Sequence, residues 1–193
     1  MKIYLARHGE SEGNIKNIFY GRTDFPLTEK GREEAEKLGK EIALYEIDRC
    51  YSSTLIRARH TAEIALKDRE MPLSLHDELM EQDMGEWECV QFDDIVKDPV
   101  KDGPELIRFW AKVCVPGGES FGDVKNRVKP LIEKILEDDR DVLIVAHYGS
   151  LTAVCAILLK LDDETAGALN FEHERLSCIE YLNGHARLNF LNR

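Results

Sequence analysis

The chain of 193 residues lacks the features of membrane-spanning and disulfide-stapled proteins. It has no apolar run near the ~18 residues needed to cross a bilayer, and it does not begin with the charged and apolar regions of a secretory signal. Its five cysteines are widely spaced, and no Cys-x-x-Cys pair suggests a zinc or redox site. We therefore expect a cytoplasmic protein with reduced thiols and no membrane partner.

Positive charge is also scarce in this sequence. The chain has 26 Lys and Arg residues against 37 Asp and Glu residues, which gives a formal net charge of −11. Such a surface repels nucleic acid and anionic lipid, so we expect neither as a partner. A small anionic ligand must instead meet a local cluster of positive side chains.

No internal repeat, low-complexity tract or linker divides the sequence. Its length and its 43% of hydrophobic residues fit a single domain over residues 1–193. Residues 81–116 mix acidic residues, tryptophan, proline and glycine without a clear period, which predicts a partly helical insertion that acts as a lid or specificity element. The sequence leaves open whether the protein forms a homodimer.

Apolar runs of strand length alternate with segments of helical period in the rest of the chain. Two alternating runs near the end are joined by Asn183-Gly184, which is a strong hairpin signal. The pattern predicts an α/β fold, a three-layer α/β/α sandwich around a mostly parallel mixed sheet with a C-terminal hairpin. The predicted strands are 3–5, 50–51, 73–75, 142–145, 176–182 and 186–191, and the predicted helices are 28–43, 55–66, 120–136 and 151–161.

Histidine followed closely by glycine occurs at the ends of two of these strands. The first strand leads into Arg7-His8-Gly9, and the strand at 142–145 leads into His147-Tyr148-Gly149. If the two strands are parallel, both imidazoles emerge at the carboxyl edge of the sheet, where open α/β sheets bind ligands. Arginine forks bind phosphate oxygens, and imidazole is an uncharged nucleophile at neutral pH, so this pattern indicates phosphoryl transfer.

Further motifs accompany the two histidines along the chain. They are Leu5-Ala6-Arg7-His8-Gly9-Glu10-Ser11 with Asn14, Gly21-Arg22-Thr23-Asp24 with Leu27-Thr28 and Gly31, Ser53-x-x-x-Arg57-Ala58-x-x-Thr61-Ala62, Leu79-x-Glu81 with Gly85-x-Trp87-Glu88, Pro116-Gly117-Gly118-Glu119-Ser120, and Ala146-His147. In this order the six blocks resemble those of the histidine phosphatase superfamily, the phosphoglycerate mutase-like proteins. The blocks span residues 5 to 149, so the resemblance is specific and covers most of the chain.

The resemblance implies a role for each of these residues. It makes His8 the nucleophile that forms a phosphohistidine, His147 a donor to the phosphoryl oxygens, and Glu81 the acid that protonates the leaving group. Glu81 must then hold a proton at neutral pH, through burial, the substrate's charge or close carboxylates such as Asp83 and Glu86. The implied phosphate-binding residues are Arg7, Asn14, Arg57 and His147, and the candidates for the substrate pocket are Gly21, Arg22 and Tyr148.

Structural alternatives stay open for several of these positions. Arg57 on a helix can be a solvated charge or half of an ion pair, and Asp83 can take the place of Glu81. Tyr148 stands where the family often has glycine, and its phenol can narrow the pocket or bind substrate; Cys89 also stands where glycine is frequent. The remaining histidines carry no motif and are expected at the surface or in packing, namely His60, His76, His173 and His185. Trp87 and Trp110 are expected to anchor the core or the lid.

Both phosphatases and mutases belong to the family that the chain resembles. The insertion is short, and acidic residues outnumber its basic residues Lys97, Lys101, Arg108 and Lys112. This favours a phosphatase of small phosphorylated metabolites, similar to the compact bacterial branch that includes α-ribazole phosphatase. Phosphoglycerate mutase and a catalytically weak phosphate-binding module are the alternatives. No cofactor is implied, and no third ligand joins His8 and His147 at a spacing suited to a metal.

Overall fold

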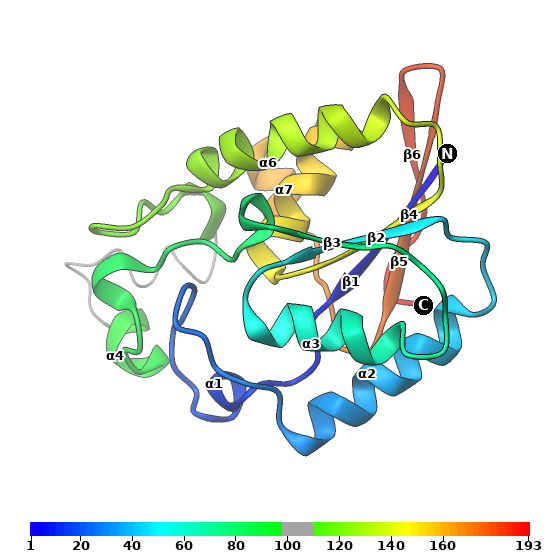
Figure 1. Ribbon diagram of the computed structural model, residues 1–193. Coiled ribbons are helices and arrows are strands. Elements are labelled where there is room, and N and C mark those ends of the chain that lie inside the picture. Colours follow the sequence, from blue (N-terminus) through cyan, green and yellow to red (C-terminus); the bar gives the residue numbers. More distant parts are fainter. Residues whose placement is uncertain (98–109) are drawn as a thin grey trace.

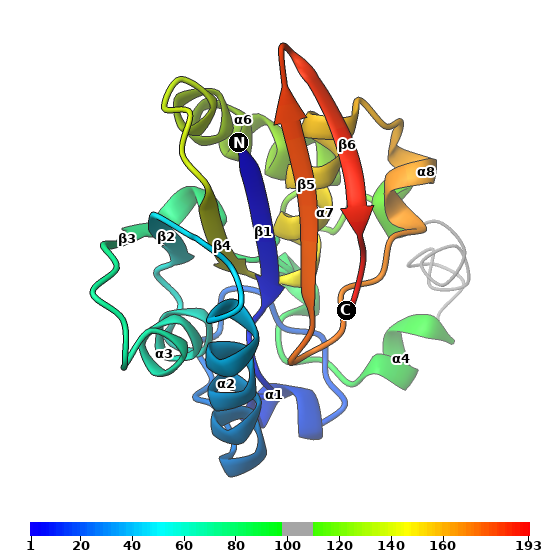
Figure 2. The same ribbon diagram turned by 90° about the vertical axis from the view of Figure 1, so that its right-hand side faces the viewer.

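The computed structural model describes residues 1–97 and 110–193, and one six-stranded sheet lies at its centre. The strands are β1 (Lys2–Arg7), β2 (Arg49–Ser53), β3 (Leu73–His76), β4 (Val142–Ala146), β5 (Leu176–Leu182) and β6 (His185–Phe190), in the order β3-β2-β4-β1-β5-β6. The first four in this order are parallel, whereas β5 runs antiparallel to β1 and to β6. This confirms the predicted mixed sheet, with the C-terminal hairpin at one edge (Figure 2).

Helices cover both faces of the sheet and complete the predicted three layers (Figure 1). Tyr4 and Ala6 of β1 pack with α2 (Glu29–Ile42) and α3 (Ile56–Ala65). Ile3 and Leu5 pack with α6 (Phe121–Leu136) and α7 (Tyr148–Leu159), because successive side chains of a strand point to opposite faces. The helices are α1 (Glu12–Ile15), α2 (Glu29–Ile42), α3 (Ile56–Ala65), α4 (Phe92–Val96), α6 (Phe121–Leu136), α7 (Tyr148–Leu159) and α8 (Asp163–Gly167), with 3-10 turns η1 (Asp77–Leu79), η2 (Gly85–Trp87) and η4 (Trp110–Lys112).

Capping residues start the two long outer helices where the sequence predicts. The Thr28 side chain accepts a hydrogen bond from the Gly31 N–H at 3.0 Å and begins α2. Ser120 and Asp123 form a reciprocal capping box at the start of α6. Each cap satisfies backbone N–H groups that the first helical turn leaves unpaired. None of the helices in the described ranges is long and apolar enough to cross a membrane.

Helix α7 begins three residues earlier than the sequence predicts. The Ser150 hydroxyl accepts from the backbone N–H of His147 at 3.1 Å, so the first helical turn contains Tyr148 and Gly149. Tyr148 and Gly149 do not fit the apolar spacing of a helix, so the sequence predicts that the helix begins at Leu151 rather than at Tyr148. The rest of α7 is almost entirely buried between the sheet and its neighbours, as expected for a helix that is apolar on all sides. The early start places the N-terminus of a long helix at the edge of the sheet.

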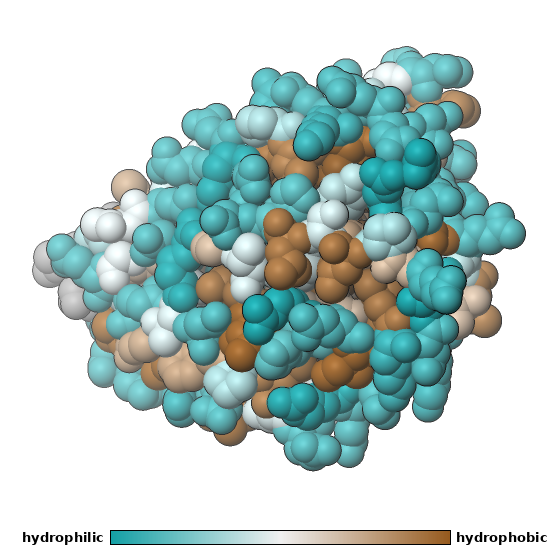
Figure 3. Space-filling view, in the orientation of Figure 1, coloured by the Kyte–Doolittle hydropathy of each residue, from teal (hydrophilic) through white to brown (hydrophobic). Residues whose placement is uncertain are grey.

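The insertion forms short helical elements around a small core of its own. Trp87, Ile95, Val113 and Val115 are buried together, and η2, α4 and η4 surround them. Lys101 and Arg108 of the insertion lie outside the described residues. The surface in Figure 3 is mostly hydrophilic, with hydrophobic side chains across the middle and the lower left of the face. The short helices α1 and α8 were not predicted, because one helical turn carries too little periodic pattern.

Candidate active site

The structure brings His8 and His147 together at the carboxyl edge of the sheet. Strands β1 and β4 are parallel neighbours, and Arg7 pairs with Ala146, so the histidine after each strand reaches the same place. The centroids of the two imidazole rings are 5.1 Å apart. Both residues are buried, with exposed fractions of 2% for His8 and 0% for His147. The predicted meeting of the two histidines is therefore present in the fold.

The hydrogen bonds of the two rings assign complementary tautomers. His8 Nδ1 lies 2.8 Å from the carbonyl oxygen of Gly9, which can only accept, so Nδ1 carries the proton and Nε2 keeps its lone pair. Arg57 Nε donates to His147 Nδ1 at 3.2 Å, so the proton of His147 is on Nε2. This buried Nε2–H has no partner among the described residues. One ring thus presents a nucleophile, and the other presents a hydrogen-bond donor.

Burial and two arginines keep both imidazoles uncharged. Burial lowers the pKa of His8 well below its ordinary value, and the positive charges of Arg57 and Arg7 lower it further. Burial and Arg57 likewise hold the pKa of His147 well below its ordinary value. Protonation of either ring would add a positive charge to a buried and already positive site. His8 is therefore neutral at neutral pH, as attack through its lone pair requires.

Two arginines form the local positive cluster that the acidic composition demands. Arg57 on α3 is 1% exposed, which rules out a solvated charge. Its Nη1 and Nη2 atoms donate to the carbonyl oxygens of Thr23 at 3.1 Å and Gly21 at 2.7 Å. Arg7 donates to the carbonyl oxygen of Phe171 at 3.1 Å, and its buried Nε has no partner in residues 1–97 and 110–193. Both guanidinium groups are thus fixed before any phosphate arrives.

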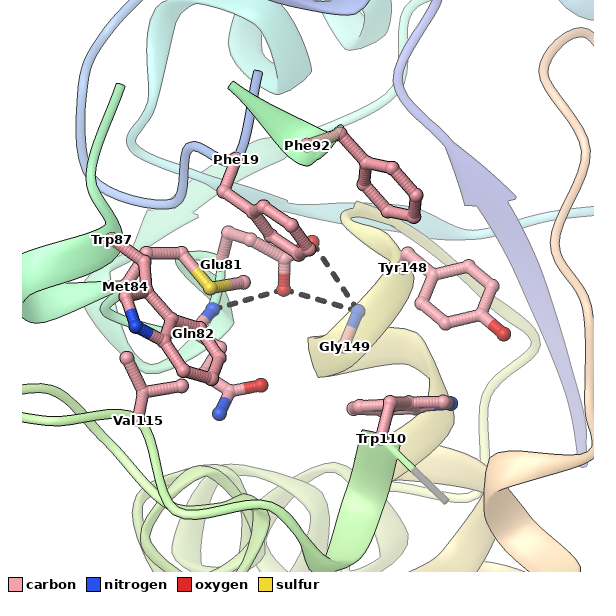
Figure 4. Close-up of a pocket in the computed structure, with 10 residues that line it drawn as sticks. All are labelled: Phe19, Glu81, Gln82, Met84, Trp87, Phe92, Trp110, Val115, Tyr148 and Gly149. Carbon is pink, nitrogen blue, oxygen red and sulfur yellow. Dashed lines mark hydrogen bonds between the residues drawn. The ribbon is translucent and has the colours of Figure 1, made fainter. Parts of the chain in front are cut away.

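Glu81 lies against the first turn of α7 and is 9% exposed. Its Oε1 atom accepts from the backbone N–H of Gly149 at 3.0 Å and from that of Gln82 at 2.9 Å (Figure 4). The positive end of the helix dipole favours a carboxylate at this position. A Cβ atom on residue 149 would lie 2.6 Å from Glu81 Oε1, so any other residue here would displace the Glu81 carboxylate from this position. The Glu81 carboxylate, which accepts from the Gly149 N–H, therefore explains the glycine at the second position after His147.

The segment 116–120 holds the backbone that carries Glu81. Glu119 accepts from Arg127 Nε at 2.7 Å and from the Asp83 N–H at 2.9 Å, and Arg127 also donates to the carbonyl oxygen of Glu81 at 3.1 Å. A Cβ atom on Gly118 would lie 2.4 Å from the carbonyl oxygen of Asp83, so the two segments touch through their backbones. This sequence block therefore positions the acidic loop rather than contacting the histidines.

Asn14 and Asp83 are both engaged in local backbone bonds. Asn14 Oδ1 accepts from the Ser11 N–H at 2.9 Å and caps α1, and no described residue accepts from its amide nitrogen. Asp83 Oδ1 accepts from the Gly85 N–H at 2.9 Å, which turns this carboxylate into the adjoining loop.

The three pocket candidates have different positions. Tyr148 lines a cavity beside Glu81, although its hydroxyl donates to the carbonyl oxygen of Leu169 at 2.8 Å. Gly21 uses its carbonyl oxygen to hold Arg57. Arg22 forms an ion pair with Glu119 at 3.3 Å and does not line this cavity. The structure thus places Tyr148 in a pocket and gives Gly21 and Arg22 supporting contacts.

His173 belongs to the site although no motif identifies it. Its ring centroid is 5.5 Å from that of His8, and its Nδ1 lies 2.5 Å from the carbonyl oxygen of His8, to which it donates. Burial, and then the charge of Arg7, lower the pKa of His173 to about 4. Sequence patterns cannot find this residue, because it lies in a loop before β5 that only the fold brings beside β1.

These neutral histidines are expected to make the fold sensitive to acid. The unfolded chain binds protons near pH 6.5 that the folded chain does not bind, so the free energy of unfolding decreases as the pH falls below that value. For His173, a pKa of about 4 corresponds to a loss of about 2 kcal/mol between pH 7 and pH 5. Urea unfolding at pH 7, 6 and 5 measures this slope, above the range in which carboxylates titrate.

Two variants separate the histidines of the site from the others. The His173→Asn variant is expected to show a shallower loss of stability between pH 7 and pH 5 than the unaltered protein. The His185→Asn variant, which changes an exposed side chain of β6, is expected to keep the original slope. A free energy of unfolding that stays constant or rises towards pH 5 would contradict neutral, buried imidazoles.

The donors at this edge suit an anion better than a cation. The part of the chain that the structure describes contains no group of three or more His, Cys, Asp or Glu side chains placed to hold a metal ion. Arg57 already occupies Nδ1 of His147, and a metal ion beside two guanidinium groups would be repelled. Guanidinium, imidazole and amide N–H groups are instead the donors that bind phosphate oxygens.

Comparisons with known proteins agree with this geometry. The family model of the histidine phosphatase superfamily (branch 1) matches residues 3–193. The chain is 32% identical to the adenosylcobalamin/alpha-ribazole phosphatase of Salmonella typhimurium strain LT2, over 100% of this chain and 96% of that protein. The crystal structure of the alpha-ribazole phosphatase from Shigella flexneri has a TM-score of 0.89 and 29% identity, and the match covers 100% of this chain and 96% of that one.

A mutase is also among the relatives. The chain is 37% identical to the 2,3-bisphosphoglycerate-dependent phosphoglycerate mutase of Rhizobium johnstonii, over 87% of this chain and 84% of that protein. The fold and the histidine pair define an α/β enzyme of phosphate esters. The chain belongs to the histidine phosphatase superfamily and is a phosphatase of that type.

Proposed function

We propose that this protein is a metal-independent phosphatase that hydrolyses small phosphomonoesters through a phosphohistidine on His8. We also propose that it acts in the cytoplasm on a small phosphorylated metabolite, since its net charge of −11 disfavours nucleic acid and membrane surfaces as substrates. The observation that carries the proposal is the pair of facing imidazoles. His8 Nε2 holds a lone pair, and His147 Nε2 holds a buried proton without a partner among the described residues.

The first step transfers the phosphoryl group to the enzyme. His8 Nε2 forms a bond to phosphorus while the bond between phosphorus and the ester oxygen breaks. Arg7, Arg57, His147 and the Asn14 amide donate to the non-bridging oxygens, whose charge they stabilise in the transition state. The departing oxygen takes a proton from Glu81 and leaves as an alcohol. The Gly149 N–H and the α7 dipole then stabilise the new carboxylate of Glu81.

The second step returns the enzyme to its starting state. The oxygen of a water molecule attacks phosphorus, the bond between phosphorus and His8 Nε2 breaks, and the Glu81 carboxylate takes the proton of the water. Inorganic phosphate leaves, and Glu81 carries its proton again. The same carboxylate therefore acts as acid in the first step and as base in the second, which agrees with its fixed place beside the histidine pair.

Phosphoglycerate mutase is the second candidate, because the chain is 37% identical to such a mutase. A mutase must hold the carboxylate of phosphoglycerate in addition to its phosphate. None of the described residues that line the cavity beside Glu81 is a lysine or arginine. Lys97 and Lys112 of the insertion pair with Asp93 at 2.7 Å and Glu164 at 2.6 Å. These contacts favour hydrolysis over mutase activity.

Activity in the presence of a chelator tests the proposal. The protein is expected to release phosphate from a simple phosphomonoester at the same rate with and without EDTA, because two fixed guanidinium groups supply the positive charge and the neutral His147 imidazole donates a hydrogen bond. With 3-phosphoglycerate and added 2,3-bisphosphoglycerate, phosphate release is expected to exceed formation of 2-phosphoglycerate. Loss of the rate in EDTA and its recovery with a divalent ion would contradict the metal-free site. Faster isomer formation would establish the mutase.

A further inference from the structure

An apolar cavity of about 190 Å³ opens directly beside Glu81 (Figure 4). Apart from Glu81, Gln82 and Gly149, its described walls consist of hydrophobic and aromatic side chains. The non-aromatic members of this set are Met84 and Val115, and the aromatic members are Phe19, Trp87, Phe92, Trp110 and Tyr148. We call the five aromatic residues the aromatic wall. A concave, largely apolar site with few polar groups is the usual form of a small-molecule pocket.

The aromatic wall contains two ring pairs that come from separate elements. Phe19 and Phe92 stack with their centroids 5.0 Å apart at an angle of 13°. Trp110 of η4 and Tyr148 of α7 contact each other at 5.4 Å and 57°. In Figure 4 the two pairs border the cavity from different sides. Four rings from four segments of the chain therefore surround one space.

The polar atoms of two of these rings bind protein groups outside the cavity. Trp110 Nε1 donates to the carbonyl oxygen of Gly167 at 3.1 Å, and the Tyr148 hydroxyl donates to that of Leu169 at 2.8 Å. Both rings are thereby fixed in orientation. Because their polar atoms already have partners, they offer their carbon surfaces to the cavity. The ligand that such a surface recognises is itself apolar and flat.

The position of Glu81 decides which part of a substrate enters this cavity. A general acid must lie within hydrogen-bond reach of the oxygen that it protonates. Glu81 lines the cavity and is held by Gly149 at the histidine edge, so the group attached to the leaving oxygen extends into the cavity. This step rests on the proposed function. The volume of about 190 Å³ is below the ~300–1,000 Å³ of pockets for drug-sized ligands, which leaves room for one ring system.

We propose that the enzyme is specific for phosphomonoesters whose alcohol carries a single aromatic ring system bound against the aromatic wall. Ring pairs in stacked or edge contact gain affinity beyond the burial of their area. A polyhydroxylated alcohol would lose its hydrogen bonds to water on entering these walls. A carboxylated alcohol would meet the acidic Glu81 and no cation among the described lining residues.

Non-hydrolysable phosphonates test the cavity without requiring turnover. Calorimetry should show that benzylphosphonate binds about tenfold more tightly than ethylphosphonate, because its ring is buried against the aromatic wall. Cyclohexylmethylphosphonate, which is equally apolar but not flat, should bind more weakly than benzylphosphonate. Equal affinities for the benzyl and ethyl compounds would overturn the proposal. Equal affinities for the benzyl and cyclohexylmethyl compounds would overturn its aromatic part.

Matched variants test where the ring of benzylphosphonate binds. Phe92 is 39% exposed, so Phe92→Ala is expected to fold normally and to reduce the preference for benzylphosphonate about threefold, with ethylphosphonate unaffected. Phe19→Ala should act in the same direction. Phe190→Ala removes a ring from the edge strand β6 that does not line the cavity, so it should change neither affinity. A preference that both cavity variants leave unchanged would overturn the assignment of this wall.

Hydrolysis separates this inference from the proposed function. Benzyl and ethyl phosphates both release a primary alcohol, so kcat/KM for benzyl phosphate should be about tenfold higher through ring binding alone. Hydrolysis of both esters at equal kcat/KM would overturn the ring specificity and leave the phosphatase proposal intact. Tighter binding of benzylphosphonate without hydrolysis of any ester would support the ring site and overturn the phosphatase proposal.

Discussion

The His8→Ala variant is expected to lose activity towards phosphomonoesters by on the order of 10⁴-fold or more in kcat/KM. The substitution removes the Nε2 lone pair that forms the bond to phosphorus. Arg57 and His147 stay in place, because they are held by bonds to Thr23, to Gly21 and to each other. Inorganic phosphate should therefore still bind the variant. Phosphate release and phosphate binding, measured on the same preparation, separate the loss of the nucleophile from the loss of the site.

The covalent intermediate provides the decisive control for this variant. Quenching the unaltered enzyme in base during turnover should leave a phosphoryl group on the peptide that contains His8, and mass spectrometry should find none in the variant. His185→Ala, a change on exposed β6, should keep full activity and labelling. Substantial activity in His8→Ala, or a phosphoryl group on another side chain, would contradict the assignment of the nucleophile.

The Glu81→Gln variant is expected to slow hydrolysis of alkyl phosphates by about 10²- to 10⁴-fold, since general acid–base catalysis contributes that much. Glutamine keeps an oxygen that can accept from the Gly149 N–H, so the loop should stay in position. 4-Nitrophenyl phosphate releases a stable phenoxide and should lose much less in the first step. Because the second step needs the base, phosphohistidine should accumulate and produce a burst of 4-nitrophenol.

Asp83→Asn is the matched control for the general acid. Asp83 stands two residues from Glu81, and its carboxylate accepts from the Gly85 N–H at 2.9 Å. This substitution should therefore change kcat little and should produce no burst. If Asp83→Asn slowed alkyl phosphates more than Glu81→Gln, the acid would be Asp83. An equal loss in the rate of the first step for alkyl and 4-nitrophenyl phosphates in Glu81→Gln would likewise contradict a proton-donating role.

The sequence predicts the sheet well because strand runs and helix caps are local features. The apolar run 142–145 and the Thr28 cap each lie within a few residues, and both occur where predicted. Helix α7 shows the limit of this approach: its first turn lacks apolar residues and forms because Ser150 binds the backbone of His147. The sequence places His173 at the surface or in packing and does not predict its contact with His8, because that contact joins residues 165 positions apart.

The sequence by itself placed each histidine at the end of a strand, and the two meet because these strands are parallel neighbours whose carboxyl ends share one edge of the sheet. It also determined the family, through motifs whose residues stand close together in the chain. The tertiary structure decided which ring nitrogen carries a proton, where Glu81 is anchored and what surrounds the leaving group. These properties depend on hydrogen bonds and packing between distant segments, so no local pattern of residues encodes them.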